Sequence, residues 1–81
     1  MFYVYILECS DGSYYTGQTN DLERRMKQHK SGTGAKYVRS RLPFQLRYTE
    51  TYPSRGEAMR REIAIKKYSH NKKGDLINSA S

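Results

Sequence analysis

The stretch FYVYILECSDGSYYTGQ, residues 2–18, decides the fold of this chain. Its first eight residues are apolar or aromatic on both alternating faces, apart from Glu8, which is typical of a central strand covered on both sides. Ser10-Asp11-Gly12 is a turn signal, and residues 13–18 have the composition of a return strand. The stretch therefore predicts a β-hairpin whose first arm is buried.

The length of the hairpin loop decides which side chains share a face. A two-residue Asp11-Gly12 turn would place Tyr5 and Tyr15 on opposite faces of the sheet. A three-residue loop with Gly12 in the left-handed conformation would instead place Tyr5 opposite Gly17. Sequence alone permits both turns. Gly17 favours the three-residue loop, because a glycine leaves room for the ring of Tyr5, and the two phenols are then expected to be diagonal neighbours.

Capping residues predict two helices after the hairpin. The first is expected from Asp21 to about Lys30, with Asn20 as its N-cap, and it is followed by a basic connector over residues 35–43 with one helical turn. The second begins after the capping box that Ser54 forms with Glu57 and runs to about residue 69.

The remaining segments complete the expected fold. Residues 44–52 alternate in the manner of a half-exposed edge strand, with one face formed by Phe44, Leu46, Tyr48 and Tyr52. A short final helix is expected around 72–78. The order ββαβα(α) predicts an α+β fold with a three-stranded antiparallel sheet flanked by helices. We expect one domain over residues 1–81, with a frayed tail at about 79–81.

Composition narrows the class of protein. The formal net charge of +7 on 81 residues favours nucleic acid as a partner, the alternative being a soluble basic surface that binds nothing. The single cysteine, Cys9, excludes an internal disulfide, and no Cys/His cluster has zinc spacing, which favours a cytoplasmic location. We find neither an apolar run long enough to span a membrane nor a secretory signal.

The first predicted helix carries two polar groups on its packing side. Spacing of i, i+3, i+4 and i+7 places four residues on one stripe: Leu22, Arg25, Met26 and His29. Arg25 and His29 therefore lie beside the apolar anchors. They either extend from the edge of the stripe to solvent or belong to a site.

The second long helix supplies an acid. Its apolar residues span an arc of roughly 160° at 100° per residue, and Glu62 falls inside this arc with Lys66 close by. An ordinary ion pair between residues i and i+4 is the alternative to a functional carboxylate. That alternative accounts for the pair but not for the placing of both charges on the packing face.

Taken together, these residues resemble the GIY-YIG nuclease superfamily, in particular its smallest, stand-alone members. The first family motif corresponds to Tyr3-Val4-Tyr5 and the second to Tyr15-Thr16-Gly17. The helical Arg and the His four residues later match Arg25 and His29, and the metal-binding Glu of the later helix matches Glu62. The opening Gly of the first motif is Tyr3 here, and the middle Ile of the second is Thr16. The late Asn of the family has no secure match, with Asn71 the nearest in sequence.

The resemblance implies an endonuclease that hydrolyses phosphodiester bonds with one divalent cation, Mg²⁺ or Mn²⁺, on Glu62. Arg25 would hold the scissile phosphate. A tyrosine, Tyr15 with Tyr5 supporting it, would position or deprotonate the water with help from His29. The substrate would be DNA, branched or nicked DNA included, or RNA.

Four basic residues are expected to contact backbone phosphates without reading bases, namely Lys36, Arg39, Arg41 and Arg47. Two other functions stay open from the sequence. One is a nucleic-acid-binding module with little or no activity, and the other is a domain that depends on a protein partner for targeting. The sequence does not predict an oligomeric state.

Overall fold

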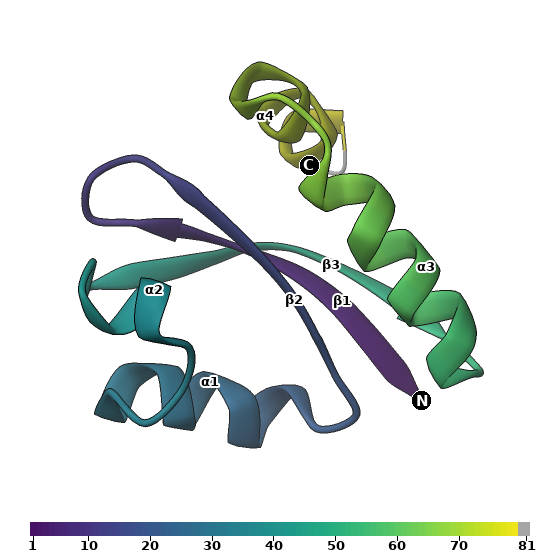
Figure 1. Ribbon diagram of the computed structural model, residues 1–81, viewed down its shortest axis with the longest axis horizontal. Helices are drawn as coiled ribbons and strands as arrows, with labels where there is room; N and C mark the ends of the chain where they lie inside the picture. The colour runs from purple at the N-terminus through teal and green to yellow at the C-terminus, as the bar shows by residue number, and fades with distance from the viewer. Residues whose placement is uncertain (80–81) are drawn as a thin grey trace.

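The computed structural model describes residues 1–79. Its three strands are β1 (Phe2–Cys9), β2 (Tyr14–Thr19) and β3 (Phe44–Tyr52), and they form an antiparallel sheet in the order β2-β1-β3. Its helices are α1 (Leu22–Ser31), α2 (Lys36–Arg39), α3 (Arg55–Lys66) and α4 (His70–Ser79). Figure 1 shows α1 and α2 on one face of the sheet and α3 and α4 on the other. The predicted α+β fold is confirmed.

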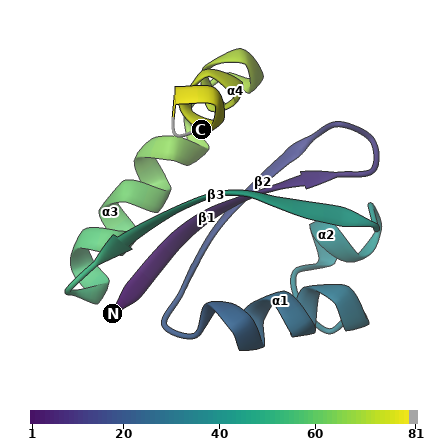
Figure 2. The ribbon, with the colours of Figure 1, turned by 180° about the vertical axis from the view of Figure 1, so that it is seen from behind.

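The central strand β1 is covered on both sides, as its sequence predicts. Four consecutive residues, Val4 to Leu7, have no exposed surface. Val4 and Ile6 pack against residues of α3 and α4, whereas Tyr5 and Leu7 pack against α1 and α2. The view from behind in Figure 2 shows the same three layers, with the sheet between the two helical pairs. Each face of β1 therefore anchors a separate core.

The hairpin has the three-residue loop. The backbone N–H of Cys9 donates to the carbonyl of Ser13 at 2.8 Å, and Gly12 has a φ of 81°. Tyr5 consequently lies opposite Gly17 and Leu7 opposite Tyr15. This register is the one that the glycine across from Tyr5 predicts.

The first helix begins one residue later than expected. Asp21, not Asn20, is the N-cap of α1, and its side chain accepts a hydrogen bond from the backbone N–H of Arg24 at 3.0 Å. The Oγ1 atom of Thr19 accepts from the backbone N–H of Asp21 at 3.1 Å. This contact fixes the aspartate in the extended conformation that an N-cap requires.

The two C-terminal helices also differ from the prediction in their bounds. Ser54 caps α3 as predicted, but the helix ends at Lys66 and not near residue 69. A new helix, α4, begins at His70 and includes Ser79, so it is longer than expected. Residues 80–81, the rest of the predicted tail, lie outside the described residues.

The alternation predicted for β3 is wrong in one respect. A β-bulge opposite Ile6 and Leu7 leaves Arg47 as an extra residue, because Ile6 pairs with Tyr48 and Leu7 pairs with Leu46. A bulge reverses the face of every side chain beyond it. Phe44 therefore packs on the α1 side of the sheet, whereas Tyr48 and Tyr52 pack on the α3 side.

Candidate active site

The predicted residues of β1, β2 and α1 form one cluster of rings. The Oη atom of Tyr5 and the Nε2 atom of His29 share a hydrogen bond of 2.8 Å. The ring of Tyr15 lies 6.4 Å from that of Tyr5 and 5.7 Å from that of His29, centroid to centroid. Tyr5 and His29 are 0% and 1% exposed, whereas Tyr15 is half-buried. The cluster thus has a buried part and an accessible part.

Gly17 allows the ring of Tyr5 to occupy its place. A Cβ atom on Gly17 would lie 2.5 Å from the Oη atom of Tyr5 and 2.6 Å from its Cζ atom. Such distances are far below van der Waals contact, so the phenol covers the glycine directly. Gly17 of the edge strand β2 therefore packs directly against the ring of Tyr5. Tyr15, two residues before Gly17, lies beside that ring.

Arg25 lies beside both phenols, one turn of α1 before His29. Hydrogen bonding to Tyr5 raises the pKa of the Arg25 guanidinium, and Tyr15 raises it further, so Arg25 is charged at any pH of interest. Its Nη1 atom donates to the Oε1 atom of Gln28 at 3.1 Å. Its Nε atom is buried and has no hydrogen-bond partner among residues 1–79. The helix thus presents a cation with unused donor capacity to the cluster.

Burial controls the protonation of the two innermost groups. It raises the pKa of Tyr5 to about 12, against the hydrogen bond from Arg25, and the charges of Tyr15 and Glu62 add to the rise. Burial and then the charge of Arg25 lower the pKa of His29 below its ordinary value. At neutral pH we therefore expect a neutral phenol at Tyr5 and a neutral imidazole at His29.

Glu62 approaches from the other layer. It belongs to α3, which lies on the opposite face of the sheet from α1 and contacts β2 as well as β1. Its side chain is 19% exposed, and an oxygen of its carboxylate lies 3.6 Å from the Nζ atom of Lys66. Its charge contributes to the raised pKa of Tyr5, so the carboxylate acts on the ring cluster electrostatically.

The surroundings of Glu62 fit a cation held largely by water and substrate. Within residues 1–79, no three His, Cys, Asp or Glu side chains come together as a metal-binding group. Glu62 would thus be a single protein ligand. Mg²⁺ commonly takes one or two carboxylates and completes its six positions with water and phosphate oxygens, so the partly exposed carboxylate is compatible with that ion.

The four basic residues predicted to contact phosphates are placed differently. Lys36 and Arg39 are exposed on α2, which the stacking of Tyr37 on Tyr15 at 5.9 Å places next to the cluster. Arg41 also lies near this helix, where its guanidinium covers the ring of Tyr37 at 3.8 Å and its Nε atom lies 3.1 Å from Oδ2 of Asp11.

Arg47 is separate from the other three basic residues. It lies 3.6 Å from Oε1 of Glu8 and lines a pocket together with Ile77 of α4, on the far side of the sheet from the rings. Asn71, the nearest candidate for the late Asn of the family pattern, is exposed in the first turn of α4. The structure therefore gathers the phosphate-binding candidates on α2 and leaves Arg47 outside that group.

Sequence reasoning did not identify Tyr37 or the turn after α1 as parts of the site. Tyr37 gave a signal only as an aromatic residue inside the basic connector. The turn contains Gly32 with a φ of 82°, and the backbone N–H groups of Thr33 and Gly34 both donate to the carbonyl of Gln28 at 3.0 Å. It is a hydrogen-bonded turn packed against α1.

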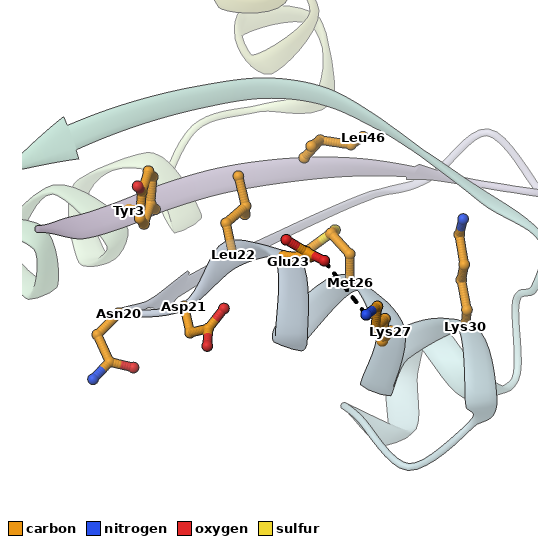
Figure 3. A pocket seen from close by; sticks show the side chains of 9 residues that line it. All are labelled: Tyr3, Asn20, Asp21, Leu22, Glu23, Met26, Lys27, Lys30 and Leu46. Atoms are coloured by element: carbon orange, nitrogen blue, oxygen red, sulfur yellow. Dashed lines mark ion pairs between the residues drawn. The ribbon is translucent and has the colours of Figure 1, made fainter.

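A pocket of about 660 Å³ lies on the opposite flank of α1. Figure 3 shows its lining side chains, from α1 and its N-terminal approach and from the sheet: Tyr3, Asn20, Asp21, Leu22, Glu23, Met26, Lys27, Lys30 and Leu46. The dashed line there is the ion pair of Glu23 with Lys27 at 3.4 Å. None of the five predicted catalytic residues lines this pocket, so it is distinct from the cluster.

None of the helices described within residues 1–79 is long and apolar enough to cross a membrane.

Comparison with known proteins gives a consistent result. The model of the GIY-YIG catalytic domain matches residues 1–75. UPF0213 protein VNG_2274C of Halobacterium salinarum is 55% identical over 95% of this chain and 100% of its own length. UPF0213 protein BH0048 of Halalkalibacterium halodurans is 57% identical over 94% of this chain and 81% of its own.

Two solution NMR structures are similar to this one. That of the UPF0213 protein BH0048 from Bacillus halodurans has a TM-score of 0.62 at 56% identity and covers 96% of this chain and 84% of that one. The structure of the protein EF2693 from E. faecalis has a TM-score of 0.65 at 42% identity, and the match covers 95% of this chain and 82% of that one. The match over residues 1–75 includes both tyrosine motifs, α1 and α3, and the chain belongs to the GIY-YIG family.

Proposed function

We propose that this protein is a metal-dependent endonuclease that hydrolyses phosphodiester bonds in nucleic acid, with DNA favoured over RNA as the candidate substrate. The observation that carries the proposal is the cluster of two phenols, an imidazole and a guanidinium from β1, β2 and α1, in which Tyr5 is hydrogen-bonded to His29 and the ring of Tyr15 lies beside both. Burying a polar group is costly unless it is hydrogen-bonded, and the buried Nε atom of Arg25 has no such partner among residues 1–79, which a purely structural core would avoid.

Arg25 is the group that we assign to the scissile phosphate. Its planar fork of donors matches a phosphate, and its raised pKa keeps it charged. Its buried Nε atom lacks a partner among residues 1–79, so a phosphate oxygen can take up this donor when the side chain adjusts. Charge neutralisation at the phosphate is the first requirement of phosphodiester hydrolysis.

Tyr15 is the phenol that we assign to the attacking water, and Tyr5 supports it. Tyr5 has a pKa of about 12, so at neutral pH it stays protonated and is a poor base. It also has no exposed surface, which keeps it out of reach of bulk water. Tyr15 is half-buried and lies beside both Tyr5 and His29. The buried pair of Tyr5 and His29 thus forms the support that fixes the position of the accessible phenol.

Glu62 is the residue that we assign to a divalent cation, Mg²⁺ or Mn²⁺. When bound there, the cation supplies Lewis acidity to the phosphate and stabilises the leaving 3′ oxygen. The Nζ atom of Lys66, whose side chain is half exposed, lies 3.6 Å from this carboxylate, so the lysine can turn toward solvent and leave the carboxylate to the cation.

Nucleic acid would bind across α2 through its backbone phosphates. Lys36 and Arg39 offer exposed charges beside the cluster, and Arg41 adds a third charge that Asp11 partly neutralises. Because these contacts are to phosphates, we expect weak, sequence-tolerant binding with a strong dependence on salt. Arg47, on the other face of the sheet, would contact only a substrate that wraps around the domain.

The test is incubation of the purified protein with branched, nicked, duplex and single-stranded DNA and with RNA, in Mg²⁺, Mn²⁺ or EDTA. We expect cleavage of at least one substrate with either cation and none in EDTA. Binding without cleavage of any substrate would indicate a nucleic-acid-binding module instead. Neither binding nor cleavage by the isolated chain would indicate a domain that needs a protein partner.

A further inference from the structure

Gly34 lies against the imidazole ring of His29. A Cβ atom on Gly34 would be 2.5 Å from the Nδ1 atom of His29, 3.1 Å from its Cε1 atom and 3.1 Å from its Cα atom. No side chain fits into that space without moving the ring or the backbone of α1. The glycine therefore determines where the ring lies.

The turn that carries Gly34 is fixed to α1. The backbone N–H groups of Thr33 and Gly34 donate to the carbonyl of Gln28, and the side chains of Ser31 and Thr33 donate to it as well, at 3.0 and 3.3 Å. Gly32, in the left-handed conformation, directs the chain back over the helix end. Gly34 cannot move away from His29 without loss of its own hydrogen bond to the Gln28 carbonyl, at 3.0 Å.

The two nitrogens of the His29 ring have different surroundings. Nε2 lies 2.8 Å from the Oη atom of Tyr5, whereas Nδ1 is buried and has no hydrogen-bond partner among residues 1–79. Nδ1 faces the side of the Gly34 Cα atom that would carry a Cβ atom in any other residue. This side of the glycine offers no hydrogen-bond acceptor. A buried N–H without an acceptor is rarer in proteins than an acceptor with a free lone pair.

We propose that Gly34 is a positioning residue, which holds His29 as the neutral tautomer with its proton on Nε2 and so directs that proton to the oxygen of Tyr5. With the Nε2 proton donated, Tyr5 accepts from His29 and its own O–H is free to point elsewhere. The consequence for catalysis rests on the proposed function, whereas the tautomer does not.

The first experiment needs no variant of the turn. Long-range ¹H–¹⁵N correlation spectra of the histidine-labelled protein at neutral pH report which ring nitrogen carries the proton. His29→Gln identifies the signals of His29, and His70 gives a reference signal. We expect His29 to be protonated at Nε2 and bare at Nδ1. A proton on Nδ1 of His29 overturns the proposal, whether or not the protein cleaves nucleic acid.

The second experiment compares Gly34→Ala with Gly56→Ala as the matched control. A Cβ atom on Gly56 would meet only the Nη1 atom of Arg60, at 3.7 Å, an ordinary contact. We expect the His29 ring signals to shift in Gly34→Ala and to stay in Gly56→Ala.

If the wild type cleaves nucleic acid, Gly34→Ala should lower kcat by about tenfold or more, with KM little changed, since the loss is one of proton positioning. Unshifted His29 signals, or full activity in a Gly34→Ala protein whose ring has moved, would overturn the positioning role. Absence of cleavage by the wild type itself would count against the proposed function alone.

Discussion

At the scale of single residues, the contact of Tyr5 with His29 joins the hydrophobic core to the polar site. Both side chains are buried, and each satisfies a polar atom of the other at 2.8 Å. His29 is also in edge contact with Tyr15 and Phe44. A histidine in these surroundings resists protonation, because a charge there would be desolvated and would face the charge of Arg25.

The lowered pKa of His29 makes stability depend on pH. Its ordinary value is 6.5, and the folded value lies below this. Between the two values the unfolded chain binds more protons, so the free energy of unfolding should fall as the pH falls below about 6.5. His29→Gln should remove this part of the pH dependence, and His70→Gln, at an exposed position, should retain it. Thermal melting between pH 5 and 8 measures both, and equal slopes in wild type and His29→Gln would contradict the account.

Gly17 is the second residue whose substitution should be informative. Gly17→Ala introduces a Cβ atom into the space of the Tyr5 phenol, where it would lie 2.5 Å from Oη. We expect a loss of roughly 1–3 kcal/mol, typical of an overpacked core. Urea unfolding compares it with Gly56→Ala, which adds the same methyl group in ordinary contact distance. A Gly17→Ala protein as stable as this control would show that the ring does not cover the glycine.

At the scale of elements, α3 is fixed to the sheet by an ion pair beside the candidate metal ligand. Arg61 binds both carboxylate oxygens of Glu50 on β3, at 2.8 and 2.9 Å, and donates to the phenol of Tyr68 at 3.2 Å. Glu50 also accepts from Tyr48 and Tyr52. This network sets the rotation of α3 and hence the direction of the next residue, Glu62.

Arg61→Ala should therefore destabilise the protein more than Arg60→Ala. Glu50 is 15% exposed, and without Arg61 its partly buried carboxylate would keep only the neutral phenols of Tyr48 and Tyr52 as partners among residues 1–79. We expect a loss of about 1–3 kcal/mol for Arg61→Ala, as for hydrogen bonds to charged groups, and a much smaller one for the exposed Arg60. Denaturant unfolding of the two variants decides the matter, and equal losses would contradict the assigned role of the network.

The sequence predicts the elements better than the details of their pairing. Gly17 and the Gly12 turn are local signals, and they predict the hairpin register correctly because Gly17 leaves room for the ring of Tyr5 and Gly12 adopts the positive φ that the three-residue loop requires. The bulge at Arg47 is not visible, since apolar residues continue at alternate positions on both sides of it. Tertiary packing, with Phe44 on His29 and Tyr48 on the core beneath α3 and α4, decides which face each residue takes.

The candidate site follows the same rule. Helical spacing places Arg25 and His29 on one stripe, and the register places both phenols on one face, so four of the five catalytic candidates can be brought together from sequence. The contact of Gly34 with His29 could not be predicted, because it depends on how the turn folds back over Gln28. The contact of α2 with Tyr15 likewise depends on tertiary packing.

At the scale of the whole molecule, the two faces of the sheet have different tasks. The face under α1 and α2 carries the rings and the exposed charges of Lys36 and Arg39, whereas α3 and α4 cover a core on the other face. With a net charge of +7, the domain should bind nucleic acid mainly through counterion release.

Lys36→Gln with Arg39→Gln should weaken binding to all sequences. For each phosphate that is no longer neutralised, the slope of log K against log salt should become shallower by about 0.9 for duplex DNA. Arg47→Gln, which also removes one positive charge but on the other face, should change the slope little. Fluorescence anisotropy over a salt series measures this, and equal effects per charge on the two faces would show that binding follows net charge alone.

The central claim, that the chain is a metal-dependent nuclease built around Glu62, is tested most directly by cleavage with Glu62→Gln. Glu23→Gln is the control for the loss of an i, i+4 ion pair, since Glu23 pairs with Lys27 at 3.4 Å as Glu62 does with Lys66 at 3.6 Å, with the Glu23 side chain 84% exposed and that of Glu62 19%. Glu23→Gln costs a few tenths of a kcal/mol in its exposed helix pair, and Glu62→Gln is nearly isosteric, so both proteins should melt close to the wild type. We predict that Glu62→Gln retains nucleic-acid affinity and loses Mg²⁺-dependent cleavage by orders of magnitude, while Glu23→Gln cleaves normally. Equal cleavage by the wild type and Glu62→Gln would contradict the account.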